Sequence, residues 1–120
     1  MTRFQRVVEI LDDAIGGPGV TIGVHGAFWR GLTRDQFVAK EVLGLKLLVL
    51  GDGAGSNLVK ALKGEAPFGA DLDNAPAEAE FNRMPAGRPP VAPEDIAFIQ
   101  KWINDQCPED PFVPTSPAGL

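Results

Sequence analysis

The sequence predicts one all-α domain, with about four short helices joined by long loops rich in proline and glycine. Apolar residues recur three and four positions apart in several separate stretches, which is the spacing of an amphipathic helix. A chain of 120 residues is typical of a single domain and can bury a core without disulfides or metal. The 14 glycines and 11 prolines imply many turns between the helices. We expect residues 1–107 to form the domain and residues 108–120 to form a proline-rich extended tail.

The N-terminal stretch predicts a helix over residues 3–15. Its apolar residues, from Phe4 to Ile15, share one face at helical spacing. The Gly-Gly-Pro-Gly run at 16–19 ends this helix. Residues 20–32 are then expected as a loop with apolar anchors.

A second helix is predicted by a capping box. Thr33 and Gln36 have the spacing at which each side chain bonds the backbone of the other, so we expect a helix over 34–43 that ends at Gly44. Residues 45–50 follow, either as a short strand or as a buried extended segment.

Two more helices complete the predicted fold. One is expected over residues 57–63, with Ser56 as its N-cap and Gly64 ending it. The other begins at Pro93, a favourable first helical residue, and has two carboxylates in its first turn. Between them, residues 65–92 form a long loop of the kind that is usually functional or disordered.

Charge and composition exclude several classes of protein. The chain has 11 Lys and Arg against 16 Asp and Glu and contains no basic run, so neither nucleic acid nor an anionic membrane is an expected partner. No stretch approaches the roughly 20 apolar residues of a membrane span, and no signal-peptide pattern is visible, which predicts a cytoplasmic protein. A single cysteine, Cys107, and a single histidine, His25, exclude multi-cysteine zinc sites and His-rich metal sites. No acid–base or nucleophile–base pair emerges from the spacing, so we do not expect an enzyme.

Two further patterns have a functional and a structural interpretation. The stretch LLVLGDGAGS, residues 47–56, resembles the start of a dinucleotide-binding fold, but Ser56 replaces the third glycine, so a helix-entry loop is the preferred interpretation. The tail has prolines at 108, 111, 114 and 117, the spacing of one polyproline II turn. It either lies along the domain or a partner, or is a loose end.

The C-terminal third of the chain resembles a known family. Residues 84–107, MPAGRPPVAPEDIAFIQKWINDQC, are similar to the end of small bacterial cytochrome c domains. The resemblance implies a cytochrome-c-like fold in which the first and last helices cross and a histidine and a methionine bind the haem iron. His25 and Met84 stand at the positions of those two ligands.

The haem-attachment motif of that family is incomplete here. The Cys-x-x-Cys-His motif falls on residues 21–25, where Thr21 and Val24 replace the two cysteines, so haem cannot be attached covalently. We favour a haem-free domain whose vacant pocket is filled by bulky side chains, since an empty pocket would lose packing energy. The expected filling residues are Phe28, Trp29, Phe37, Phe68 and Phe81.

These observations lead to two functional hypotheses. The first is a haem-free, cofactor-free cytochrome-c-like protein that acts as a non-catalytic accessory subunit by binding another protein, such as a larger redox enzyme, or by self-association. Its expected partner-binding residues are Trp29, Arg30, Arg83, Arg88 and Phe112; Trp and Arg are types enriched at interface hot spots. The alternative is an electron-transfer protein that binds haem noncovalently through His25 and Met84.

Overall fold

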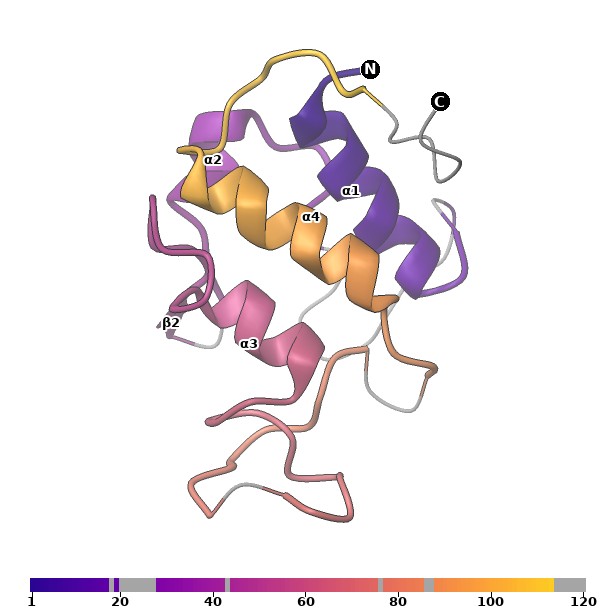
Figure 1. Ribbon diagram of the computed structural model, residues 1–120, viewed down its shortest axis with the longest axis vertical. Helices are drawn as coiled ribbons and strands as arrows, with labels where there is room; N and C mark the ends of the chain where they lie inside the picture. The colour runs from indigo at the N-terminus through magenta and orange to yellow at the C-terminus, as the bar shows by residue number, and fades with distance from the viewer. Residues whose placement is uncertain (18, 20–27, 43, 76, 86–87, 114–120) are drawn as a thin grey trace.

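The described part of the protein has four helices and one two-stranded antiparallel sheet (Figure 1). The computed structural model describes residues 1–17, 19, 28–42, 44–75, 77–85 and 88–113. The elements in chain order are α1 (Arg3–Ala14), α2 (Arg34–Val38), β1 (Glu41–Val42), β2 (Leu45–Lys46), α3 (Asn57–Lys63) and α4 (Pro93–Asn104). The predicted all-α, cytochrome-c-like fold is therefore wrong, because the chain forms a mixed structure with its own small sheet.

The error lies in the second predicted helix. The Thr33–Gln36 capping box is confirmed, but α2 ends at Val38 instead of residue 43. The chain then reverses in a β-hairpin, in which Glu41 pairs with Lys46. Gly44 has a φ of 78° and belongs to this reversal instead of ending a helix.

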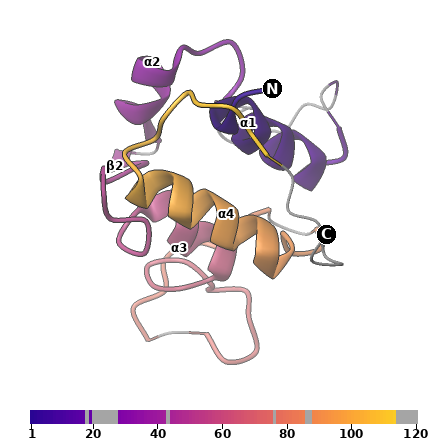
Figure 2. The ribbon, with the colours of Figure 1, turned by 45° about the horizontal axis from the view of Figure 1, so that its top comes forward.

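Helices α1 and α4 lie side by side and form the centre of the molecule (Figures 1 and 2). Thr2 and Gln5 form a capping box at the start of α1 that the sequence analysis did not identify. The predicted start of α4 at Pro93 is confirmed. The ring of Phe4 on α1 stacks on that of Trp102 on α4, with centroids 6.0 Å apart.

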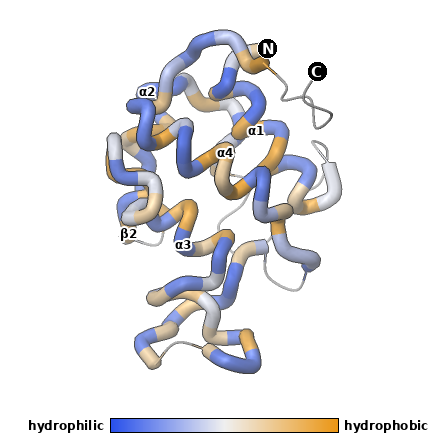
Figure 3. The backbone as a smooth tube through the Cα atoms, in the orientation of Figure 1, coloured by the Kyte–Doolittle hydropathy of each residue, from blue (hydrophilic) through white to orange (hydrophobic). Residues whose placement is uncertain are grey.

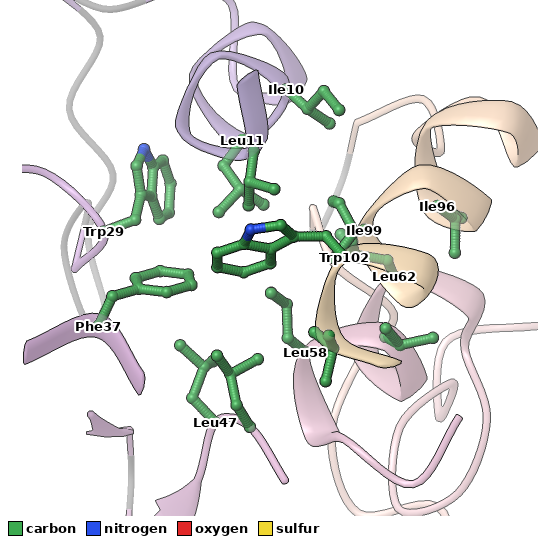
Figure 4. Packing of buried hydrophobic residues seen from close by; sticks show 14 of the residues in the cluster. Ile10, Leu11, Trp29, Phe37, Leu47, Leu58, Leu62, Ile96, Ile99 and Trp102 are labelled. Atoms are coloured by element: carbon green, nitrogen blue, oxygen red, sulfur yellow. The ribbon is translucent and has the colours of Figure 1, made fainter. Parts of the chain in front are cut away.

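The hydrophobic core surrounds Trp102. Figure 4 shows this indole between Leu11 of α1, Phe37 of α2 and Leu58 of α3, so one side chain of α4 contacts the other three helices. Trp102 and Phe37 are both 0% exposed. Burial of a large apolar side chain contributes about 1.5–3 kcal/mol, so this aromatic centre contributes substantially to the stability of the core.

Helix α3 is confirmed over Asn57–Lys63, and Gly64 ends it in the left-handed conformation with a φ of 76°. Ser56 is its N-cap residue but makes no side-chain cap bond. Its buried hydroxyl instead accepts from the backbone N–H of Val49 at 2.8 Å and donates to the carbonyl of Asp52 at 2.8 Å. Ser56 therefore fixes the preceding loop and leaves the helix end uncapped by a side chain.

Two segments without helices extend from this body. Residues 65–83, which we call the acidic loop, protrude beyond α3 at the bottom of Figure 1. Residues 108–113, which we call the strap, return from α4 across the start of α1, where Thr2 and Pro111 form an antiparallel bridge. Residues 114–120 of the predicted tail lie outside the described residues. Among the helices described, none has the length and apolar character to span a membrane.

Candidate functional site

Of the two predicted haem ligands, Met84 is described and His25 lies outside the described residues. Met84 is partly buried and packs against the main core. Its backbone N–H donates to the carbonyl of Ala61 at 2.9 Å, which joins the end of the acidic loop to α3. Met84 thus has a structural role at the base of that loop.

The five aromatic residues expected to fill a pocket are found in two places. Trp29 and Phe37 belong to the main core, and Phe28 packs edge-on against Trp29 with centroids 5.1 Å apart. Phe68 and Phe81 form a separate pair inside the acidic loop, 5.6 Å between centroids. They do not line one common pocket.

Trp29 was expected at a partner interface, but its side chain is only 4% exposed. One oxygen of Asp12, Oδ1, accepts from Trp29 Nε1 and from Arg30 Nε, both at 2.7 Å. The Arg30 guanidinium also donates to the carbonyl of Gly17 at 3.1 Å. The prediction is corrected here: Trp29 is a core residue of this chain, and Arg30 helps to hold its loop against α1.

Phe112 and the other two predicted arginines also have neighbours within the chain. The ring of Phe112 lies edge-on to Phe98, 5.4 Å between centroids, and the Arg6 guanidinium carbon lies 5.7 Å from its centroid. Arg83 donates from Nη2 to the carbonyl of Arg88 at 2.9 Å, while its Nε is buried without a hydrogen-bond partner. Among these three residues, only Arg88 is exposed.

The glycine-rich stretch before α3 is a packing loop, as the preferred interpretation held. Gly53 donates its N–H to Asn104 Oδ1 at 2.7 Å, and Gly51 donates to the carbonyl of Ile103 at 3.0 Å. A side chain at Gly53 would collide with the backbone carbonyl of Gln100. The glycines therefore let this loop approach the end of α4 closely.

Nucleophilic chemistry at Cys107 is disfavoured by its surroundings. The side chain is 0% exposed. Burial raises the pKa of the thiol to about 11, although the charge of Arg34 acts in the opposite direction. The thiol is therefore protonated at neutral pH, whereas the thiolate is the reactive form. In the described ranges, no three His, Cys, Asp or Glu side chains lie close enough together to hold a metal ion.

The acidic loop is the most distinctive surface of the described chain. It has five acidic residues, all exposed: Glu65, Asp71, Asp73, Glu78 and Glu80. It has no Lys or Arg before Arg83 at its end. The rest of the chain then has 16 − 5 = 11 acidic residues against 11 basic ones, so residues 65–80 hold the whole formal net charge of −5. In Figure 3 the backbone of this loop lies apart from the helices, and much of it is coloured as hydrophilic.

Hydrogen bonds inside the acidic loop give it a defined shape. Ala70 donates its N–H to the carbonyl of Phe81 at 2.9 Å, and Phe81 donates to that of Pro67 at 3.0 Å. Asp71 Oδ1 accepts from the backbone N–H of Arg83 at 2.8 Å. The Phe68–Phe81 pair packs between the two arms, so the loop has a small apolar centre of its own. Such compact loops with close ends are frequently functional.

This surface was not predicted, although the sequence contains a signal for it. The long loop over residues 65–92 was predicted, but charge was counted only over the whole chain. A count over residues 64–82 finds five carboxylates and no basic residue. Comparison with known proteins adds no relative, because no family model, curated protein or solved structure matches the chain.

Proposed function

We propose that this protein is a non-catalytic binding subunit whose acidic loop contacts a surface rich in lysine and arginine on a partner protein. The observation that supports this is the placement of five exposed carboxylates on one ordered, protruding loop. Carboxylates at neutral pH only accept hydrogen bonds, so they match the donor groups of Lys and Arg.

Electrostatics favours a basic protein over the other macromolecules. Residues 65–80 of the loop carry a net charge of −5 and repel phosphate groups, so nucleic acid and anionic lipid are poor partners. The same field attracts a basic surface and raises the rate of encounter, most strongly at low ionic strength. The internal bonds of the loop reduce the conformational entropy that binding would cost.

The experiment compares two triple variants that change the net charge equally. The loop variant is Asp73→Asn, Glu78→Gln and Glu80→Gln, which spares Asp71 and its bond to Arg83. The control variant is Asp13→Asn, Glu94→Gln and Glu109→Gln, at exposed positions outside the loop. A partner is captured on the wild-type chain, identified, purified and titrated against all three proteins over a range of NaCl concentrations.

We expect the loop variant to bind about 5- to 30-fold more weakly, because each exposed ion pair contributes up to about 1 kcal/mol. We expect the control variant to bind within about twofold of wild type, and salt to weaken wild-type binding most. Equal affinities for the two variants, or binding that salt does not affect, would reject the acidic loop as the contact surface.

A further inference from the structure

The strap is held on the start of α1 by contacts of three kinds. Arg3 binds the Asp110 carboxylate with two bonds, Nε to Oδ1 at 2.7 Å and Nη2 to Oδ2 at 2.9 Å. Backbone bonds run from Arg3 N–H to the Asp110 carbonyl at 2.8 Å and from Phe112 N–H to the Met1 carbonyl at 2.9 Å. The Phe112 ring packs against Phe98. The strap therefore occupies a specific seat formed by the N-terminus and α4.

The chain reaches this seat through a strained corner. Gln106 has a φ of 73° and Cys107 a φ of 52°, so two consecutive residues with side chains adopt the left-handed conformation that favours glycine. Arg34 holds the corner from outside, with Nη2 2.7 Å from the Gln106 carbonyl and Nε 2.9 Å from the Cys107 carbonyl. Short hinges under strain favour exchange of the following segment between two copies of a chain.

We propose that this protein forms a dimer in which two copies exchange their straps, each strap lying on the Arg3 seat of the other copy. The bonds from Asp110 and Phe112 to residues 1–3 link segments at opposite ends of the chain, so the same bonds form equally well between two copies. In the exchanged form Gln106 extends, which releases its own left-handed conformation but gives up the bond from the Cys107 N–H to the Trp102 carbonyl. The acidic loop takes no part, so this proposal does not depend on the proposed function.

Protein concentration sets the balance between the two forms. A strap that closes on its own chain has a high effective concentration, so the closed monomer predominates in dilute solution. The exchanged dimer gains from the relaxed hinge and increases with protein concentration. In a variant whose strap cannot close on its own chain, this high effective concentration no longer favours the monomer.

The main experiment uses two charge-reversed full-length chains, Arg3→Asp and Asp110→Arg. Each chain alone places like charges at the seat, so neither can close its strap or exchange it with an identical copy. In an exchanged heterodimer, the strap of the Asp110→Arg chain meets the seat of the Arg3→Asp chain, so an arginine again faces an aspartate. The other strap and seat keep their wild-type residues, so positions 3 and 110 are complementary at both junctions, although the Arg3→Asp chain has lost its ion pair with Asp105. We expect native mass spectrometry of the mixture to show the heterodimer at least about tenfold above either homodimer. A mixture that contains only the monomers of the two chains would overturn the proposal.

A second pair of variants tests the hinge without altering the seat. The side chain of Gln106 is exposed, so Gln106→Gly should relax the closed corner, whereas the β-branched Gln106→Val should strain it further. Light scattering after size exclusion should show more dimer for Gln106→Val than for wild type and less for Gln106→Gly. If circular dichroism shows that the charge-reversed chains do not fold, the order of dimer fractions among Gln106→Val, wild type and Gln106→Gly tests the proposal instead. Equal dimer fractions in the two hinge variants would contradict exchange.

Discussion

Asp12 shows how a single carboxylate can organise a segment distant in sequence. It lies near the C-terminal end of α1, where the helix dipole disfavours a negative charge. Its Oδ1 atom accepts from both Trp29 and Arg30 at 2.7 Å, and its side chain is only 13% exposed. The two donors offset the unfavourable position, and the carboxylate fixes the segment after residue 28 to α1.

We therefore expect Asp12→Ala to destabilise the protein by about 1–3 kcal/mol, because it leaves the buried indole N–H of Trp29 without its acceptor. The neighbouring exposed residue provides the control: Asp13→Ala should change the free energy of unfolding by less than about 0.5 kcal/mol. Urea unfolding followed by tryptophan fluorescence measures both. Equal losses in the two variants would show that the Asp12 bonds contribute nothing specific.

The role of Trp29 could not be predicted from the sequence. Tryptophan is common both in cores and at interfaces, since it joins a large apolar ring to one polar N–H. Trp29 was therefore expected both as a filling residue and at a partner interface, and its bond to Asp12 and its burial show that it belongs to the core. The spacing of 17 residues between these two partners has no local pattern, because the fold alone brings them together.

At the scale of elements, the junction of the strap with α1 depends on acidic groups. Hydrogen bonds from Arg3 lower the pKa of Asp110 and, together with a bond from Lys101, that of Asp105. A lowered folded-state pKa gives stability that is present above the ordinary pKa of Asp, about 3.9, and is lost as the pH falls through the folded-state value. The reason is that, as the pH falls, these two carboxylates take up protons at a higher pH in the unfolded chain than in the folded one.

Acid should therefore weaken the wild-type protein more than a variant without this arginine. In Arg3→Gln the two carboxylates keep more ordinary pKa values, so we expect the fall in urea midpoint below about pH 4 to become shallower. At pH 7 the same variant should be less stable than wild type. Arg88→Gln, at an exposed arginine that forms no ion pair within the described chain, serves as the control. Parallel pH profiles for Arg3→Gln and wild type would refute this account of the strap.

Helices with caps and apolar stripes in their own sequence were predicted well, whereas the hairpin, which has no such local signal, was not. Helices α1, α3 and α4 each combine an apolar stripe with a recognisable start or end; the predicted bounds of α1 and α3 and the predicted start of α4 hold to within one residue. The hairpin of β1 and β2 has strands of only two residues, so its stability comes from the surrounding structure. The hydrogen bond from Leu47 N–H to the Lys40 carbonyl and the burial of Leu47 supply that context. Because the apolar residues continue at helical spacing past Val38, the sequence pattern predicted a longer helix and gave no sign of the hairpin.

At the scale of the whole molecule, charge is divided between a neutral body and an acidic loop. In the body, Arg3 forms ion pairs that link α1 to the C-terminal segment, and Arg34 donates hydrogen bonds to the carbonyls of Gln106 and Cys107. In the loop, the five carboxylates have no basic residue between them. Within the described residues, Asp71 is the one of the five whose carboxylate accepts a hydrogen bond, from the backbone N–H of Arg83. Phe68 and Phe81 were expected to fill a vacant pocket, but they pack on each other inside this loop. The sequence contains the charge of the loop, whereas its protrusion from the body is evident only in three dimensions (Figure 1).

This division predicts that stability and binding respond in opposite directions to one change. Neutralising Asp73, Glu78 and Glu80 removes repulsion within the loop, so the loop variant should be as stable as wild type or more stable, by up to about 1 kcal/mol at low salt. The difference should disappear in about 1 M NaCl, where the Debye length is about 3 Å. Thermal unfolding at two salt concentrations, combined with the binding titration, separates the two effects. A loop variant that melts below wild type at low salt would mean that these carboxylates hold the loop together, and its weaker binding would then reflect lost structure instead of lost contacts.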